Sequence, residues 1–116
     1  MTLPELEAYA YGQLPTLQRT LAGKRLVGRI VRRAVASWPV PVLRQCDAAQ
    51  SEIVGHHMAK SIERQVRQEY GMGIILTLVL GALVQELVKI LIRWWLERSE
   101  NQMAMTALVR ESRHHD

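Results

Sequence analysis

The stretch YGMGIILTLVLGALVQ at residues 70–85 decides how this chain folds, because its 16 residues include no charged side chain. Extended to Val88, the apolar segment corresponds to about 28 Å of α-helix at about 1.5 Å per residue. The hydrocarbon core of a bilayer is about 30 Å thick, so residues 70–88 are predicted to form a single transmembrane helix. In that arrangement Tyr70, Trp94 and Trp95 act as interfacial anchors at headgroup depth.

The same stretch could instead be the core helix of a soluble bundle. Its leucines recur at three- and four-residue spacing, which is typical of a helix with one buried face. Residues 74–84 are apolar on every face, so such a helix needs several neighbours around it. The rest of the chain offers little apolar surface for this purpose. A soluble form is therefore expected to be an oligomer.

A second pattern within the apolar segment concerns every fourth residue. Gly73, Thr77, Gly81 and Gln85 share one face of the predicted helix. Small residues at this spacing let two helix backbones approach closely in lipid, and an amide can add a hydrogen bond between helices. These four residues, called the ridge below, are predicted to form a helix-packing interface, either in a homo-oligomer or with protein partners in an assembly.

The segment before the apolar stretch is strongly basic. Seven basic residues and no acidic residue lie between Ala8 and Cys46, and apolar residues recur at helical spacing over residues 16–37. A basic amphipathic helix of this kind is typical of binding to an anionic membrane surface or another anionic partner. The residues predicted to make the contact are Lys24, Arg25, Arg29, Arg32 and Arg33. Nucleic acid is a possible but less favoured partner, because residues 16–37 include no aromatic side chains to stack bases and show no zinc or helix-turn-helix signature.

The remaining sequence predicts an all-α chain, since no useful alternating strand pattern occurs. Residues 1–37 are predicted as an N-terminal helical region, whose first helix begins at the capping box Thr2–Glu5. Alternating prolines predict an extended linker at 38–42. One long helix is then predicted over 43–98, and a short C-terminal tail helix within 99–116. The apolar seam expected on the first half of the long helix consists of Leu43, Cys46, Ala49, Ile53, His57, Ile62 and Val66.

The sequence offers few groups that could support catalysis. His56-His57 and His114-His115 are adjacent pairs, whose rings point about 100° apart on a helix and chelate one ion poorly. Cys46 is the only cysteine, which excludes an intramolecular disulfide scaffold. We therefore predict no catalytic residue, no metal site and no cofactor, and the chain is not expected to be an enzyme.

Together these patterns favour a small single-pass membrane protein that serves as a structural, assembly or scaffolding subunit, with the lipid bilayer and other proteins as partners. Ten Lys and Arg residues precede the apolar segment and five follow its start, which predicts a cytoplasmic N-terminus. One alternative is a soluble oligomeric helical adaptor for an acidic partner or nucleic acid. Another is a small cationic membrane-perturbing factor resembling a holin or a toxin.

Overall fold

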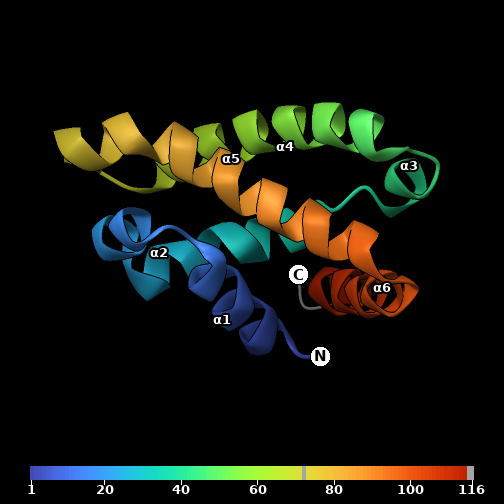
Figure 1. The fold of residues 1–116 in the computed structure, drawn as a ribbon. Coiled ribbons are helices and arrows are strands. Elements are labelled where there is room, and N and C mark those ends of the chain that lie inside the picture. The colour runs from blue at the N-terminus through green and yellow to red at the C-terminus, as the bar shows by residue number, and fades with distance from the viewer. Residues whose placement is uncertain (72, 115–116) are drawn as a thin grey trace.

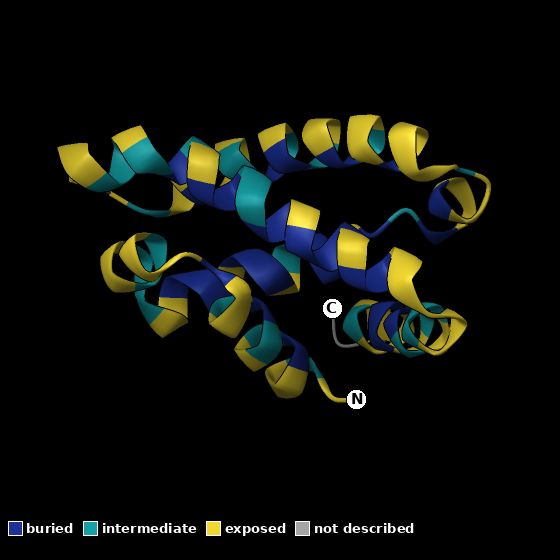
Figure 2. Ribbon diagram, in the orientation of Figure 1, coloured by how far each residue is buried: buried dark blue, intermediate teal, exposed yellow. Residues whose placement is uncertain are grey.

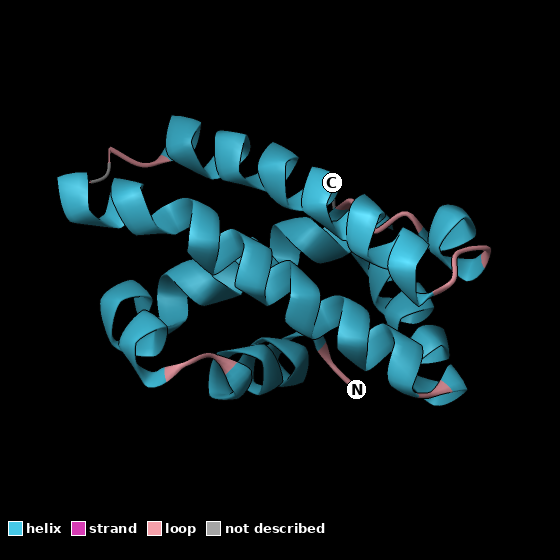
Figure 3. Ribbon diagram, turned by 45° about the horizontal axis from the view of Figure 1, so that its top comes forward, coloured by secondary structure: helices cyan, strands magenta, loops and turns pink. Residues whose placement is uncertain are grey.

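The computed structural model describes residues 1–71 and 73–114 and consists there of helices joined by short loops (Figures 1 and 3). The all-α prediction is confirmed. The helices are α1 (Leu3–Gln13), α2 (Thr16–Ala36), α3 (Val40–Arg44), α4 (Ala48–Glu69), α5 (Ile74–Glu97) and α6 (Ser99–His114). They form one bundle, in which α5 crosses between α4 on one side and α1, α2 and α6 on the other (Figure 1).

Local signals set where several helices begin. The Thr2 hydroxyl accepts a hydrogen bond from the backbone N–H of Glu5, and Pro4 occupies the first turn, so α1 starts where the capping box predicts. At α4 the Asp47 side chain accepts from the Gln50 N–H, and the Gln50 side chain accepts from the Asp47 N–H. Both caps satisfy backbone donors that have no partner inside the helix.

The basic amphipathic helix predicted over 16–37 is present as α2, with a sharp kink at Gly23. This glycine has φ 75° and ψ 163°, a conformation that side chains with a Cβ rarely adopt. The kink separates a short first part, which ends at Ala22, from a longer second part. The second part turns its apolar face into the bundle, whereas Leu17 and Leu21 on the first part stay exposed.

The prediction of one long helix over 43–98 is wrong, because the chain reverses between Tyr70 and Gly73. Tyr70 ends α4 in an extended conformation, with φ −111° and ψ 126°, and Gly73 precedes α5 in a similar one. Helices α4 and α5 then lie side by side (Figures 1 and 3). The physical reason is tertiary: a straight helix would leave the facing sides of α4 and α5 in water, and the reversal buries each against the other.

The predicted linker at 38–42 is only partly extended, because α3 begins within it at Val40. Proline is compatible with the first turn of a helix, where its missing N–H would have no helical partner anyway. Pro41 occupies that turn, so it helps to begin α3.

Helix α5 supplies the centre of the core (Figure 2). Its buried residues all lie from Leu80 onward, and α2, α4 and α6 provide the apolar surface that covers them. The expectation that the chain lacks enough apolar surface to enclose this helix therefore holds only for residues 74–79. Helix α5 is also the one helix in the described residues that is long and apolar enough to cross a membrane, a property that it shares with core helices of soluble proteins. In its most apolar 18-residue window 39% of the residues are buried.

The seam of α4 differs from the one that its apolar residues predict. Ile53 is 62% exposed and His57 is exposed, whereas Ser51, Gly55 and Ala59 are buried. The small side chains of Ser51, Gly55 and Ala59 let α4 approach α5 closely. A Cβ on Gly55 would lie 2.4 Å from Cδ1 of Ile92, so the bulky side chain of α5 occupies the space that the glycine leaves.

Candidate functional site

One end of the bundle carries an exposed apolar surface (the left-hand end in Figures 1 and 2). Ile74, Ile75 and Leu78 in the first turns of α5 are 80%, 68% and 78% exposed. Leu17 and Leu21, on the first part of α2, are exposed as well. We call these five residues the apolar tip. Monomeric soluble proteins seldom gather large aliphatic side chains in water in this way, so the tip is a candidate interaction surface.

The two segments of the apolar tip meet in space. Leu21 and residues 73–76 line one shallow hollow of about 640 Å³, whose walls are almost entirely apolar. The hollow exists because Gly23 turns the first part of α2 toward the α4–α5 reversal. Residues more than 50 positions apart in the sequence therefore form one apolar surface.

A second hollow, of about 520 Å³, is predominantly basic. We call it the basic basin. Four cationic side chains from α2 line it: Lys24, Arg25, Arg29 and Arg32. Glu7 of α1, Gly28 of α2 and Tyr70 at the end of α4 complete its lining. With four cations against one carboxylate, the basin carries a formal charge of +3.

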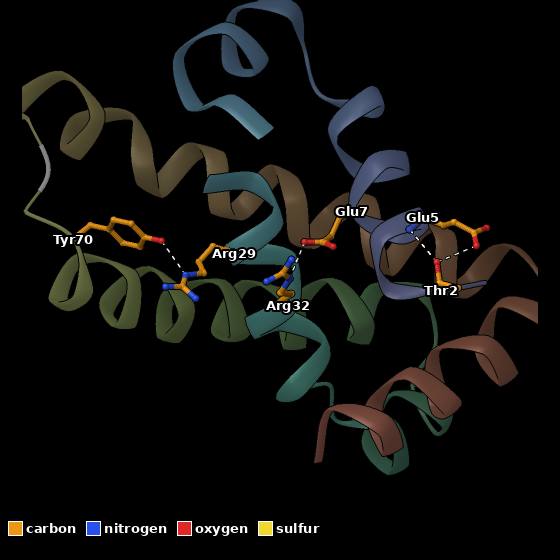
Figure 4. Close-up of polar contacts among 6 residues, drawn as sticks. All are labelled: Thr2, Glu5, Glu7, Arg29, Arg32 and Tyr70. Carbon is orange, nitrogen blue, oxygen red and sulfur yellow. Dashed lines mark hydrogen bonds and ion pairs between the residues drawn. The ribbon is translucent and has the colours of Figure 1, made fainter. Parts of the chain in front are cut away.

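Hydrogen bonds orient two of the four cations (Figure 4). Nε of Arg29 donates to the Tyr70 hydroxyl at 2.9 Å, and Nε of Arg32 donates to Oε1 of Glu7, also at 2.9 Å. A Cβ on Gly28 would lie 2.5 Å from the same Glu7 oxygen, so the glycine makes room for the Arg32–Glu7 pair. The Arg29 side chain is thereby directed toward the end of α4 and the Arg32 side chain toward α1 (Figure 4).

The other three residues predicted to contact an anionic partner differ in their intramolecular partners. The Lys24 ammonium lies 5.8 Å from the Tyr11 ring centroid, and Arg25 has no hydrogen-bond or ion-pair partner in the described part of the chain. Arg33 differs, because it pairs with Glu69 and donates to the Gln65 side chain. It joins α2 to α4 rather than facing a ligand. Its assignment to the anionic contact surface was therefore wrong, since burying the apolar face of α2 places Arg33 against the acidic end of α4.

The basic basin and the apolar tip are adjacent along the chain at two places. On α2, Leu21 of the tip lies three residues before Lys24 of the basin. At the reversal, Tyr70 lines the basin and Gly73 lines the apolar hollow. Two separate segments of chain thus run from one surface to the other. The result is a compact end that combines aliphatic side chains with a positively charged recess.

In the structure the ridge faces α4 of the same chain. A Cβ on Gly81 would lie 2.6 Å from Oε1 of Glu63, and the Gln85 amide donates to the His56 carbonyl at 3.4 Å. The Thr77 carbonyl accepts from Arg67 at 3.4 Å, whereas no atom outside its own helix would meet a Cβ on Gly73. Three of the four ridge residues therefore contact or closely approach α4.

We expect Gly81→Ile to lower the free energy of unfolding by about 1 kcal/mol, because overpacking against α4 costs about 1–3 kcal/mol, the flexible Glu63 side chain can move away, and removal of a helical glycine regains about 0.5 kcal/mol. The added side chain must displace the Glu63 carboxylate, which also pairs with Arg67 at 3.1 Å. Urea unfolding followed by circular dichroism measures the change. Leu78→Ile is the control, because Leu78 is exposed and surface substitutions usually change stability by less than about 0.5 kcal/mol. Equal unfolding midpoints for the two variants would contradict close packing at Gly81.

Two of the three predicted interfacial anchors lie in the core. Trp94 and Trp95 are buried, and the ring centroids of Trp95 and Trp38 are 5.9 Å apart. The assignment of both tryptophans to headgroup depth is therefore wrong for this structure, because the second half of α5 is enclosed by protein. Tyr70 is half-buried, and its hydroxyl is directed into the basic basin (Figure 4).

The remaining candidate groups are dispersed. His56 and His57 are exposed on α4, His114 ends α6, and His115 lies outside the described residues. Across residues 1–71 and 73–114, no three His, Cys, Asp or Glu side chains gather as metal ligands would. Cys46 is half-buried, and its thiol lies 3.2 Å from the Val42 carbonyl.

Sequence reasoning missed the apolar tip. Leu17 and Leu21 belong to the apolar stripe of α2, and Ile74, Ile75 and Leu78 belong to the uncharged run, so all five are expected to be buried in lipid or protein. The signal that could have identified them is the pair Gly71 and Gly73. Two glycines around one residue are typical of a chain reversal, and the first turn after a reversal projects from the end of a bundle.

In comparisons with known proteins, no family model matches this chain, and no curated protein and no solved structure matches it.

Proposed function

We propose that this chain is a non-enzymatic helical protein that docks on an anionic membrane surface and serves there as an assembly or scaffolding subunit. The observation that carries the proposal is the apolar tip beside the basic basin. Aliphatic side chains that enter the headgroup region, flanked by cations that meet lipid phosphates, are the two components of interfacial membrane binding. The α4–α5 reversal presents both components at one end of a folded bundle.

The size of the two contributions supports reversible docking. Five aliphatic residues at about 0.3–0.6 kcal/mol each contribute at most about 1.5–3 kcal/mol. Lys24, Arg25 and Arg29, the basin cations without a carboxylate partner among the described residues, add about 1 kcal/mol each. The sum of about 4.5–6 kcal/mol corresponds to a dissociation constant of roughly 40 µM to 0.5 mM. Stable residence on a membrane would then require several copies or a protein partner bound at the same time, which increases avidity.

A second candidate function is the single-pass membrane subunit, and the length of α5 favours it. Its 24 residues correspond to about 36 Å of helix, which exceeds the hydrocarbon thickness of a bilayer. In that form α5 would leave the bundle and cross the membrane, with the basic N-terminal helices on the cytoplasmic side. The two candidates differ in whether α5 remains in contact with α2, α4 and α6.

Vesicle co-sedimentation of the full chain tests the docking proposal. Wild type should bind vesicles of phosphatidylcholine with phosphatidylglycerol, and the binding should weaken with salt, because exposed charges are screened. Ile74→Gln/Ile75→Gln should weaken binding about three- to eightfold, since two aliphatic side chains are lost from the tip. An alkaline carbonate wash should release the wild-type protein. Retention after the wash would instead favour the spanning form.

The matched control is Ile53→Gln/Met103→Gln. These two side chains are also exposed and apolar, but they lie on α4 and α6, away from the tip. The control should bind vesicles as the wild type does. If both double variants bind equally well, the tip is not the docking surface, and binding that is lost equally in both would indicate nonspecific hydrophobic adsorption.

A further inference from the structure

We propose that the basic basin is a specific site for a phosphate monoester headgroup of a membrane lipid, such as that of phosphatidic acid. This inference rests on the proposed membrane docking and adds to it the chemical class of the lipid. A diffuse basic surface would attract any anionic lipid in proportion to its charge. The contacts inside the basin instead describe a recess with oriented donors.

Arg29 is the central donor of this recess. Its Nε atom is occupied by the Tyr70 hydroxyl at 2.9 Å, which fixes the plane of the guanidinium and leaves its two terminal nitrogens available (Figure 4). A guanidinium presents two parallel N–H groups, a geometry that matches two oxygens of one phosphate. Because the Tyr70 oxygen accepts from Arg29, its own O–H is free to donate to the same ligand.

Lys24 and Arg25 supply the remaining charge. Arg25 has no partner among the described residues, and the Lys24 contact with the Tyr11 ring lies at the long end of the cation–π range. The negative charge of Glu7 is compensated by Arg32, whose Nε donates to Oε1 of Glu7. Glu7 therefore does not cancel the charge of the other three cations. Three uncompensated cations around one recess favour a headgroup whose charge approaches −2 over one that carries −1.

The position of the basin selects a lipid source over a soluble one. Tyr70 of the basin precedes Gly73 of the apolar hollow by three residues, and Leu21 of that hollow precedes Lys24 of the basin by three, so the acyl chains of a lipid whose phosphate occupies the basin can reach the apolar tip. A phosphate on a soluble metabolite would leave that apolar surface uncovered.

The experiment compares vesicles of phosphatidylcholine that contain either phosphatidic acid or phosphatidylglycerol, adjusted to equal zeta potential. Wild-type protein should bind the phosphatidic acid vesicles roughly tenfold more tightly, since each charge-assisted hydrogen bond in the recess adds to the affinity. Lys24→Gln/Arg25→Gln should lose this preference. The control Arg110→Gln/Arg113→Gln, which removes two exposed cations from α6, should keep it.

The outcomes separate this inference from the docking proposal. Equal binding of both vesicle types overturns the phosphate site and leaves docking intact, whereas no binding to either type overturns both. A soluble arm uses glycerol 3-phosphate, with the Arg29 Nε–H resonance as the readout. If that compound binds as tightly as the vesicles do, the lipid source is wrong. Loss of the preference in the α6 control as well would show that net charge, and not the basin, creates it.

Discussion

Leu80→Arg is expected to unfold the protein. Leu80 is fully buried in the bundle, so the substitution removes an aliphatic core side chain and leaves a charged group without a partner in apolar surroundings. The combined cost should reach about 5 kcal/mol or more, which equals the total stability of many small domains. Circular dichroism in buffer should show a loss of helix signal and of the cooperative thermal transition.

Leu78→Arg is a closely matched comparison. In a membrane span over 70–88, residues 78 and 80 lie one position on either side of the centre, so an arginine at either position costs about the same in lipid. In the bundle the two positions differ completely, because Leu78 is 78% exposed. Leu78→Arg should therefore keep the wild-type fold and change the unfolding midpoint only slightly.

The pair of variants consequently distinguishes the folded bundle from the spanning helix. Folded Leu78→Arg together with unfolded Leu80→Arg supports a bundle in which α5 is a core helix. If both variants retain their helix content in detergent and both fail to insert into membranes, α5 spans the bilayer and the bundle is not the membrane-bound form.

The second large effect is expected at Trp95. Trp95→Ala should lower the free energy of unfolding by about 3–5 kcal/mol, because a fully buried indole is lost and the surrounding helices cannot close the cavity. Trp38 packs against it, with ring centroids 5.9 Å apart and planes tilted by 58°. A double-mutant cycle with Trp38→Ala should show a coupling of about 0.5–1.5 kcal/mol, the usual value for an aromatic pair.

Trp95→Phe is the control for this cavity. The indole N–H of Trp95 is buried and has no hydrogen-bond partner in the described residues, so replacing it with a ring that has no donor removes an unsatisfied polar group. This gain should offset part of the lost packing and keep the cost near 1 kcal/mol. Urea unfolding followed at 222 nm measures all variants without depending on tryptophan fluorescence. A phenylalanine variant as unstable as the alanine variant would contradict this account.

Much of the fold could be predicted from local features of the sequence. The capping residues Thr2 and Asp47 precede α1 and α4, and the apolar periodicity of 16–37 predicts α2 nearly to the residue. Such features act over one or two helical turns, so neighbouring residues contain most of the information. Anionic binding by Lys24, Arg25, Arg29 and Arg32 stays a prediction, and these four line the basin, whereas Arg33 pairs with Glu69. Tyr70, predicted as an interfacial anchor, lines the basin too.

What the sequence determined by itself is therefore an all-α chain, a basic amphipathic helix and one helix that must leave water. The glycines Gly71 and Gly73 permit the reversal between Tyr70 and Gly73 but cost a continuous helix only about 1 kcal/mol each. The packing of α4 on α5, which is tertiary, supplies the main gain from the reversal. The same packing decides which apolar residues are covered: Leu80 is buried, and Ile74 is 80% exposed. Hydropathy cannot make this distinction, because it indicates only that both side chains are apolar. Whether another helix covers such a side chain depends on how the helices pack.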